Sequence, residues 1–411
     1  MNAALLLFFI SFPPLAGASE FEELPELVNK KNQHVSGAAL KREAAERLTG
    51  FLARSYIPTL EAHVGGESFR TGSVAGETQP YGALELKLNL FRGGRDALEE
   101  STRQAQSRVA RAGFEQTRLQ ELTQARHSYW ALVYYREQVT LIDDALKQNE
   151  TNLAAGNKRI KAGIATETDR IEFEMYRVQL GQDRARMILG AANSQRALNV
   201  LIGRAEGTPL ETTQTLPHQH DDVILDAALE TQTHRDIQAL VAEGEIANSQ
   251  QQLAYRWWAP SLDLYGSYSL YRFQDRSNTL LADRFEAAAG ITLRMNVFDG
   301  LQSVASGDSS RLRAEGVRQE TAQTARELSA NFEGAKQELR LTHDLIHAGE
   351  QSVETGAEYL KRTQAEYARG VKNSPDVFSA TEKYVNLRRR YAEIRRDYQI
   401  AKSDLLAILG K

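Results

Sequence analysis

Residues 88–93 read LNLFRG, and a variant of the same stretch, MNVFDG, returns at residues 295–300. The two stretches are 207 positions apart in a chain of 411 residues. The same offset joins Gly163 to Gly370. Matches that share one register indicate a chain of two structurally equivalent halves. The offset is far longer than the unit of a solenoid repeat, and internal duplication of this kind is common among membrane transport proteins.

The repeat divides the chain into segments. We expect residues 19–203 to form the first repeat, residues 222–411 the second, and the proline- and glycine-containing residues 204–221 the connector between them. Residues 1–18 contain a short apolar run that ends in the small-residue sequence AGA, which is typical of a signal peptide. The basic residue that normally precedes such a run is missing. We expect cleavage after Ala18.

Four segments alternate between apolar and polar residues, with the period of two that is typical of a β-strand that has one buried face. The segments are residues 59–64, 82–90, 261–270 and 289–297. The polar positions include Glu85, Lys87 and Arg294. The sequence therefore predicts four strands, each with one apolar and one polar face.

Four strands cannot close a barrel, and isolated hairpins leave exposed edges. Three copies would supply twelve strands, an even number within the range of outer-membrane barrels. The polar faces would then line a wet lumen, and the loops at residues 65–79 and 274–283 would be extracellular. An ordinary antiparallel sheet packed on a core is the alternative interpretation.

Two long segments lack proline and carry apolar residues at helical spacing, at residues 96–155 and 301–368. About 60 helical residues span about 90 Å, too long for a compact domain, so such helices must pack side by side as coiled coils. Further helices are predicted at residues 22–54, 166–201, 222–255 and 375–409.

Each long helix and its shorter partner meet at a glycine. Gly163 and Gly370 are suited to the left-handed turn that ends a helix. Thr166 followed by Asp169 matches a capping box. In the second half, the spacing predicts Ser374 as the N-cap, with a proline at the first helical position. These turns are the expected tips of two helical hairpins.

The composition argues against other functions. Fifty basic and 54 acidic residues nearly balance, so nucleic acid is not the expected partner. Cysteine is absent, which excludes disulfides, thiolate metal sites and a lipid-modified N-terminal cysteine. His343 and His347, and a second cluster at residues 218–222, lack the glutamate of a zincin motif and are interpreted as surface residues. No catalytic or cofactor-binding motif is present, so we predict no enzymatic activity, no metal and no cofactor.

Several of these stretches resemble the TolC-like outer-membrane efflux protein family. Residues 90–94 and 297–300 resemble its strand-to-helix motif, residues 125–138 its long-helix signature, and residues 367–370 with Asp376 its helix tip. The resemblance covers nearly the whole mature chain. It implies a mixed α and β membrane protein: a homotrimer with a twelve-stranded barrel in lipid and a long coiled-coil tunnel in the periplasm.

The resemblance also implies a function and its sites. The expected function is an outer-membrane channel of a tripartite efflux pump or type I secretion system, whose partners are a periplasmic adaptor and an inner-membrane pump. Arg92 and Ser379 depart from the family pattern. The expected sites are the entrance residues Asp376 and Asp169, the adaptor-docking tips Gly163, Ile164, Arg369, Gly370 and Val371, and the barrel-lumen residues Glu85, Lys87 and Arg294.

A periplasmic coiled-coil adaptor or scaffold without a pore is the alternative function. It would use long hairpins for protein contacts, but it would not need four amphipathic strands. An enzyme of unknown type in the outer membrane is the remaining alternative, with no catalytic residues to support it.

Overall fold

The protein is described by a computed structural model. It describes residues 21–69, 77–163, 166–210, 212, 214–217, 226–274 and 281–411. The expected signal peptide at residues 1–18 lies outside these ranges, as do Ile164 and the histidine and aspartate cluster at residues 218–222.

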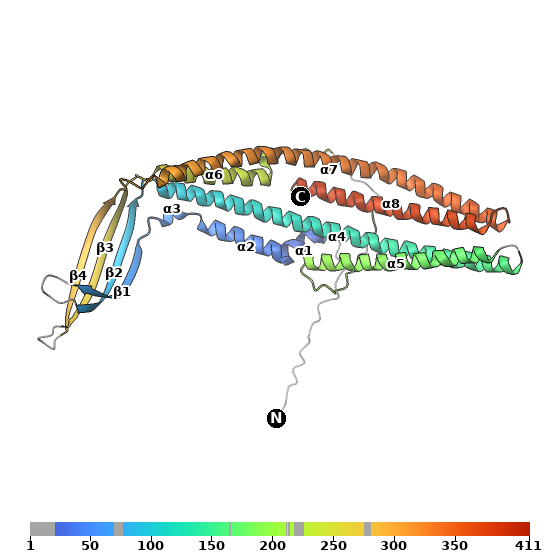
Figure 1. Ribbon diagram of the computed structural model, residues 1–411, viewed down its shortest axis with the longest axis horizontal. Coiled ribbons are helices and arrows are strands. Elements are labelled where there is room, and N and C mark those ends of the chain that lie inside the picture. The colour runs from blue at the N-terminus through green and yellow to red at the C-terminus, as the bar shows by residue number, and fades with distance from the viewer. Residues whose placement is uncertain are drawn as a thin grey trace, which may run out of the picture. The chain divides into compact units, whose positions relative to one another are not determined.

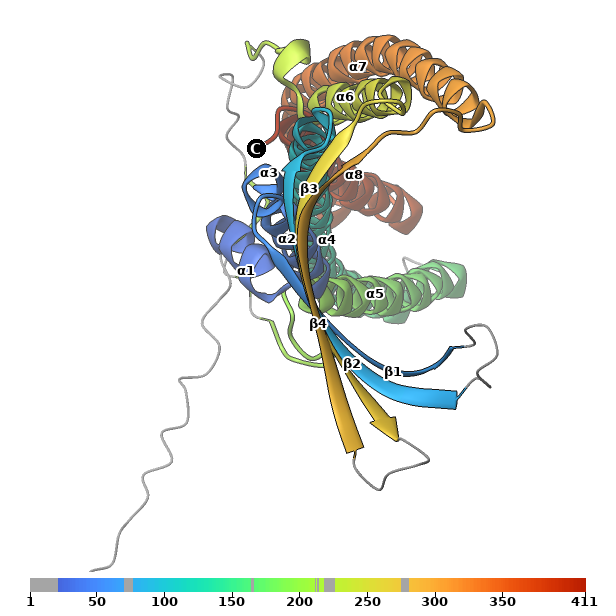
Figure 2. The same cartoon turned by 90° about the vertical axis from the view of Figure 1, so that its left-hand side faces the viewer.

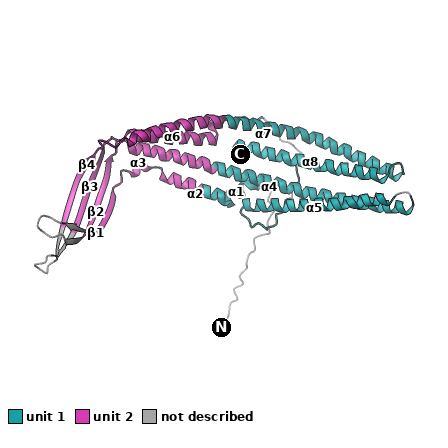
Figure 3. Cartoon of the chain, viewed as in Figure 1, with its two compact units in different colours: residues 1–38, 115–231, 326–411 teal, residues 39–114, 232–325 magenta. Residues whose placement is uncertain are grey.

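The chain forms two compact units that interleave along the sequence (Figure 3). Unit 1 contains residues 1–38, 115–231 and 326–411, and unit 2 contains residues 39–114 and 232–325. Two of the four unit boundaries, at residues 114/115 and 325/326, fall inside long helices, and none falls in the predicted connector. The division of the chain into two sequence repeats therefore stays a prediction.

The two long hairpins expected from the sequence are present (Figure 1). Helix α4 (Arg95–Lys161) is followed by α5 (Glu167–Leu201), and α7 (Gln302–Ala368) is followed by α8 (Ser374–Ile408). The bounds of the second pair differ from those of the first by the offset of the sequence repeat, at both ends of each helix. Among the described residues, no helix combines the length and the apolar character needed to cross a membrane.

The expected helix at residues 22–54 is broken into shorter pieces. A 3-10 turn, η1 (Phe21–Glu23), leads into α1 (Leu24–Lys31), α2 (Gln33–Leu48) and α3 (Phe51–Arg54). Asn32 is extended, and its side-chain oxygen accepts the backbone N–H of His34 at 2.8 Å and of Val35 at 3.1 Å. These bonds compete with helix continuation, so the prediction of one helix was wrong.

The expected helix at residues 222–255 is shorter than predicted. The 3-10 turn η3 (Thr231–Thr233) precedes α6 (Arg235–Tyr255). His234 is extended and caps α6, because its ring nitrogen accepts the backbone N–H of Asp236 at 3.3 Å. Residues 222–225 lie outside the described part of the chain.

Four antiparallel strands form one sheet in unit 2, in the order β1-β2-β3-β4. They are β1 (Thr59–Phe69), β2 (Glu77–Phe91), β3 (Ser261–Gln274) and β4 (Leu281–Arg294). All four strands extend past the predicted bounds at the end next to the expected loops, so residues 65–69, 77–79, 274 and 281–283 of those loops are strand. Backbone hydrogen bonding continues there whatever the side-chain polarity. β4 ends at Arg294, although the alternation of side chains continues to Val297.

The register gives the sheet one apolar and one polar face, as predicted. Leu86 is paired with Leu60 on β1 and with Gly266 on β3, which in turn is paired with Ala289 on β4. The next position along β2, Glu85, is paired with Glu61 and with Ser267. Neighbouring side chains point to opposite faces, so charges gather on one face and leucines on the other.

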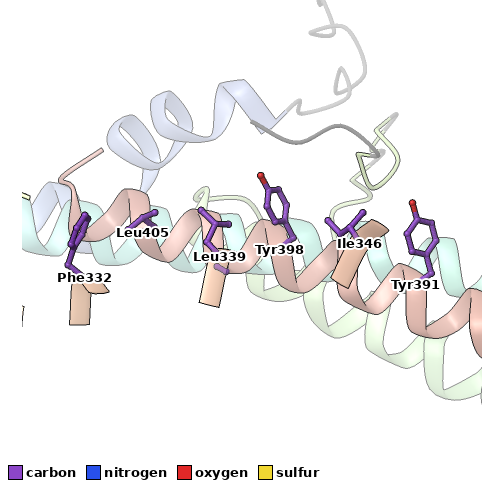
Figure 4. Packing of buried hydrophobic residues seen from close by; sticks show 7 residues of the cluster. Phe332, Leu339, Ile346, Tyr391, Tyr398 and Leu405 are labelled. Atoms are coloured by element: carbon purple, nitrogen blue, oxygen red, sulfur yellow. The ribbon is translucent and has the colours of Figure 1, made fainter. Parts of the chain in front are cut away.

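The core of unit 1 consists of seams between helices. One seam joins α7 to α8 (Figure 4). Its residues recur every seven positions on both helices, which is the spacing of coiled-coil packing. They are Phe332, Leu339 and Ile346 on α7, and Tyr391, Tyr398 and Leu405 on α8.

A second seam joins α4, α5 and α8. Leu141 and Ile142 of α4 pack with Leu180 of α5, and the ring of Tyr176 on α5 lies edge-on to that of Phe378 on α8, with centroids 5.2 Å apart. Burial raises the pKa of the Tyr176 hydroxyl to about 12, so this core tyrosine stays uncharged at physiological pH. The expectation that the long helices pack laterally is confirmed.

Candidate functional site

The turn between α7 and α8 has the hydrogen-bond pattern of a Schellman motif. Gly370 has a φ of 80° and donates its N–H to Tyr367 O at 3.0 Å, and Val371 donates its N–H to Glu366 O at 3.0 Å. Glycine adopts this left-handed conformation without the steric cost that other residues meet. Gly370 thus ends the long helix as predicted.

The cap of α8 differs from the prediction. Asn373, and not Ser374, is the N-cap: its side-chain oxygen accepts the N–H of Asp376 at 3.2 Å. An Asp376 carboxylate oxygen accepts the N–H of Asn373 at 3.2 Å, which completes a capping box. Asparagine and serine are equally good caps, so the sequence alone could not separate these neighbours.

Asp376 is therefore already engaged in a structural role. Its carboxylate lies at the third helical position of α8 and 3.9 Å from the ammonium group of Lys372. The side chain is 39% exposed, so the carboxylate remains accessible to water and ions. Its repeat equivalent Asp169 lies in the first turn of α5, but its side chain is outside the described residues.

The turn between α4 and α5 also begins with a left-handed glycine. Gly163 has a φ of 74° and donates its N–H to Ile160 O at 2.9 Å. Helix α5 begins directly after Thr166, the predicted cap position. At both glycines an added Cβ would meet no atom within 4 Å, so the conformation and not crowding requires glycine.

The two turns are held at one end of unit 1 by a contact that the sequence did not predict. Arg159 on α4 donates to Tyr367 O on α7 at 2.8 Å, and its guanidinium lies 4.1 Å from the Tyr367 ring centroid. The Tyr367 hydroxyl is 3.2 Å from the hydroxyl of Ser374. The contact joins residues 208 positions apart, so only the adjacency of the hairpins reveals it.

The other predicted tip residues lie at the surface beside these turns. Val371 is 73% exposed, and the exposed Arg369 donates from its side chain to Ala365 O at 3.2 Å. We name Gly163, Arg369, Gly370 and Val371 the tip surface.

The polar face of the sheet carries the predicted lumen residues. Lys87 lies 3.9 Å from Asp263 on the adjacent strand. Glu85 lies 3.9 Å from His63, which is also 3.6 Å from Glu61. Arg294 lies at the end of β4, opposite Ser261.

The apolar face of the same sheet is exposed within the chain. Leu60 is 67% exposed, Val64 90% and Leu293 68%. On β2, Leu84 and Leu86 are also exposed. Soluble proteins rarely leave a continuous apolar face of this size uncovered, so lipid or another protein must cover it.

The strand-to-helix motifs act as helix starts. Asp299 accepts the N–H of Leu301 at 3.0 Å and of Ser303 at 2.9 Å, and hydrogen bonding by Ser303 holds the pKa of Asp299 below its usual value. The first half has Arg92 in place of this aspartate, and there the buried Asp96 bonds Asn89 at 2.8 Å. Arg92 therefore cannot accept the first N–H groups of α4 as Asp299 does for α7, but the first turn of α4 contains the carboxylate of Asp96.

The described residues offer little for metal chemistry. They contain no group of three or more histidine, cysteine, aspartate or glutamate side chains placed to hold a metal ion. His343 and His347 lie with ring centroids 5.6 Å apart and their planes nearly perpendicular.

Comparison with known proteins gives a consistent result. Residues 227–411 match the sequence model of the outer membrane efflux protein family. A search of curated sequences finds no match. The fold is similar to that of a membrane protein from Pseudomonas aeruginosa, with 19% identity over 95% of this chain and 93% of that chain and a TM-score of 0.79. It is similar to that of VceC from Vibrio cholerae, with 16% identity over 96% of each chain and a TM-score of 0.79. It is also similar to that of the MtrE outer membrane channel from Neisseria gonorrhoeae, with 18% identity over 95% of this chain and 88% of that chain and a TM-score of 0.77.

These likenesses extend over nearly the whole chain, and at this level of identity they establish the fold. The family match adds sequence evidence for the second half. Together they agree with the resemblance seen in the sequence: residues 227–411 match the outer membrane efflux protein family, and nearly the whole chain has the fold of solved outer-membrane channels.

Proposed function

We propose that this protein is the outer-membrane channel subunit of a tripartite efflux pump, with its sheet in the outer membrane and its helical hairpins in the periplasm. The observation that carries the proposal is the sheet with one exposed leucine-rich face and one charged face in a single register. Such a sheet fits between lipid and water. The family match and the fold support it.

Three copies form the channel. In the chain, β1 and β4 are the edge strands of the four-stranded sheet, and each has a neighbour on one side only. Joining β1 of one copy to β4 of the next satisfies both edges, and three copies close a twelve-stranded barrel. The apolar faces then meet lipid, and Glu85, Lys87 and Arg294 face the water-filled lumen.

The chain is built from two repeats, residues 19–203 and 222–411, with residues 204–221 as the connector and residues 1–18 as a signal peptide. The matching bounds of the paired helices support this division. The connector is tied to the helices: Arg136 of α4 donates to Leu210 O and to the Thr212 hydroxyl, and Arg395 of α8 donates to Leu216 O at 2.9 Å.

The tip surface, with the adjoining Ile164, docks the periplasmic adaptor. It supplies exposed side chains on turns whose shapes are fixed by Gly163 and Gly370. A docking surface needs a fixed shape so that little ordering entropy is lost on binding. The adaptor in turn connects the channel to an inner-membrane pump. A type I secretion system, which exports a polypeptide, would use the same order of channel, adaptor and inner-membrane pump.

An adaptor without a pore is the less favoured function. It has no use for an exposed apolar sheet face, whereas the channel places this face in lipid. Cell fractionation separates the two: the channel is expected as a detergent-requiring trimer in the outer membrane. A soluble periplasmic protein would contradict the proposal.

Asp376 lines the periplasmic entrance of the channel, together with Asp169. Three copies bring three Asp376 carboxylates around one opening, which raises the local cation concentration. Asp376→Asn is expected to lower the cation-to-anion permeability ratio and to relieve block by multivalent cations added from the periplasmic side. Single-channel recording measures both.

The capping box supplies the matched control. Asn373→Ala removes the cap, at about 1 kcal/mol of α8 stability, while the Asp376 charge remains. It is expected to speed hydrogen exchange in the first turn of α8 and to leave ion selectivity unchanged. Unchanged selectivity in Asp376→Asn would limit this residue to its capping role.

A further inference from the structure

Two histidines lie about one helical turn apart on α7 and take no part in the proposed channel. His343 and His347 are four positions apart, and residues at this spacing are neighbours on one face of a helix. A histidine pair at this spacing is the arrangement with which a single helix binds zinc in metalloproteases. Surface histidines can have any orientation, whereas these two have a defined arrangement.

The two rings lie at a distance that suits a shared metal ion. Their centroids are 5.6 Å apart and their planes are at 83° to each other. Zinc lies about 2.1 Å from a ligating histidine nitrogen, which puts the ion about 3 Å from the ring centroid. At the tetrahedral angle, two rings on one zinc ion therefore have centroids about 5 Å apart. A small rotation of the exposed His347 side chain would bring the pair to this separation.

A carboxylate lies beside one ring nitrogen of His343. Asp344 Oδ1 is 3.4 Å from His343 Nδ1. Metal-ligating histidines commonly donate their second ring N–H to a carboxylate, which fixes the tautomer and the orientation of the ring. The His343 side chain is 20% exposed, and its ring centroid lies 6.3 Å from that of the buried Tyr398 on α8. The carboxylate and the packing together would make Nε2 of His343 the ligating nitrogen.

The charge along this part of α7 favours a cation. Residues 343–354 include three acidic residues, Asp344, Glu350 and Glu354, and no lysine or arginine. Glu350, Glu354 and the two histidines lie within an arc of about 60° around the helix axis. No third histidine or acidic side chain of the described residues is placed to complete a metal site, so water would fill the remaining coordination positions. The two glutamates instead raise the local concentration of cations.

The histidine pair is open to solvent. Helix α7 is one unbroken helix from Gln302 to Ala368, with α8 on one side of it (Figure 2). Leu339 and Ile346 fill the seam with α8, whereas His347 lies on the exposed part of the helix surface. An ion therefore reaches the pair without any change in helix packing.

We propose that His343 and His347 bind one divalent transition-metal ion per chain, with Asp344 orienting His343. Imidazole nitrogen suits zinc, copper and nickel, whereas calcium and magnesium prefer oxygen ligands. The site lies within one helix, so it depends neither on the proposed channel nor on the number of copies that form it.

Zinc binding to the whole protein in detergent tests the site. The protein is produced without a polyhistidine tag, freed of metal with a chelator and titrated with zinc chloride by calorimetry. We expect saturable binding at one zinc ion per chain. His343→Ala and His347→Ala are each expected to abolish this binding, and Asp344→Asn to weaken it about tenfold or more.

Two controls separate the pair from histidine content alone. His347→Ala/Ala348→His keeps two histidines but places them five positions apart, about 140° around the helix axis, and is expected to lose zinc binding. His127→Ala is expected to bind zinc normally. His127 also lies beside a carboxylate, with its Nε2 2.9 Å from Asp404, but it has no histidine four positions away in the sequence.

Electron paramagnetic resonance of bound Cu²⁺ counts the ligating nitrogens. Two are expected in the unsubstituted protein, and at most one in either alanine variant. Absence of saturable zinc binding, binding that persists in both alanine variants or in the shifted variant, or a single nitrogen on copper in the unsubstituted protein would overturn the site. If His343→Ala does not fold, His347→Ala decides, because His347 is exposed. None of these results bears on the channel, which conductance and cell fractionation test separately.

Discussion

Leu86→Arg is expected to prevent the protein from accumulating in the outer membrane. Leu86 lies on the apolar sheet face between Leu60 and Gly266, and its side chain is 46% exposed within the chain. If this face contacts lipid, a charge near the midplane costs about 2–4 kcal/mol for each copy. Heat-modifiable trimer in the outer-membrane fraction, quantified by immunoblotting, measures the effect.

Ser267→Arg is the matched control, because it introduces the same residue on the polar face of the adjacent strand. Ser267 is paired with Glu85, so the new guanidinium gains a partner and water. Lys87 is less suitable, because it lies near the buried Asp263 and its replacement would leave that carboxylate without a nearby cation. Equal assembly of the two arginine variants would contradict the assignment of the faces.

The double variant Gly163→Val/Gly370→Val is expected to abolish export while the trimer and its sheet remain intact. Both glycines have positive φ values, and a residue with a Cβ adopts this conformation at a cost of about 1–2 kcal/mol. Open space around both glycines means that strain in the turn, and not a clash, is the cause. Each 1.4 kcal/mol needed to restore the docking shape weakens adaptor binding about tenfold.

Export from intact cells and site-specific crosslinking of the adaptor to the tips measure this loss. Gly37→Val serves as the control, because Gly37 also has open space but lies within α2 and is not among the glycines with positive φ. It is expected to export normally. Crosslinking of the adaptor only along the middle of the helices would place the docking surface elsewhere.

The long helices were predictable because their signal is local. Two proline-free segments with apolar residues at helical spacing leave few other conformations, and α4 and α7 match the predicted segments to within several residues at each end. Strand bounds were predicted less well. The backbone ladder continues through Gly65 and Gly66, which pair with Tyr81 and Pro80, although these residues are typical of loops.

Capping and tertiary contacts were the hardest to predict. Asn32 interrupts the first helix through bonds from its own side chain, and asparagine is also tolerated inside helices. Asn373, and not the predicted Ser374, is the N-cap of α8. The contact between Arg159 and Tyr367 depends on two hairpins lying side by side, which no local pattern reveals. The tip glycines were found because a positive φ restricts the residue type.

The most direct test of the account is the conductance of the purified protein in a planar lipid bilayer. A channel built from three copies is expected to give discrete current steps of uniform size, from a detergent-solubilised trimer extracted from the outer membrane. The same extraction from cells that produce the Leu86→Arg variant should give no such steps. The account would be contradicted if the unsubstituted protein were soluble in the periplasm and produced no conductance.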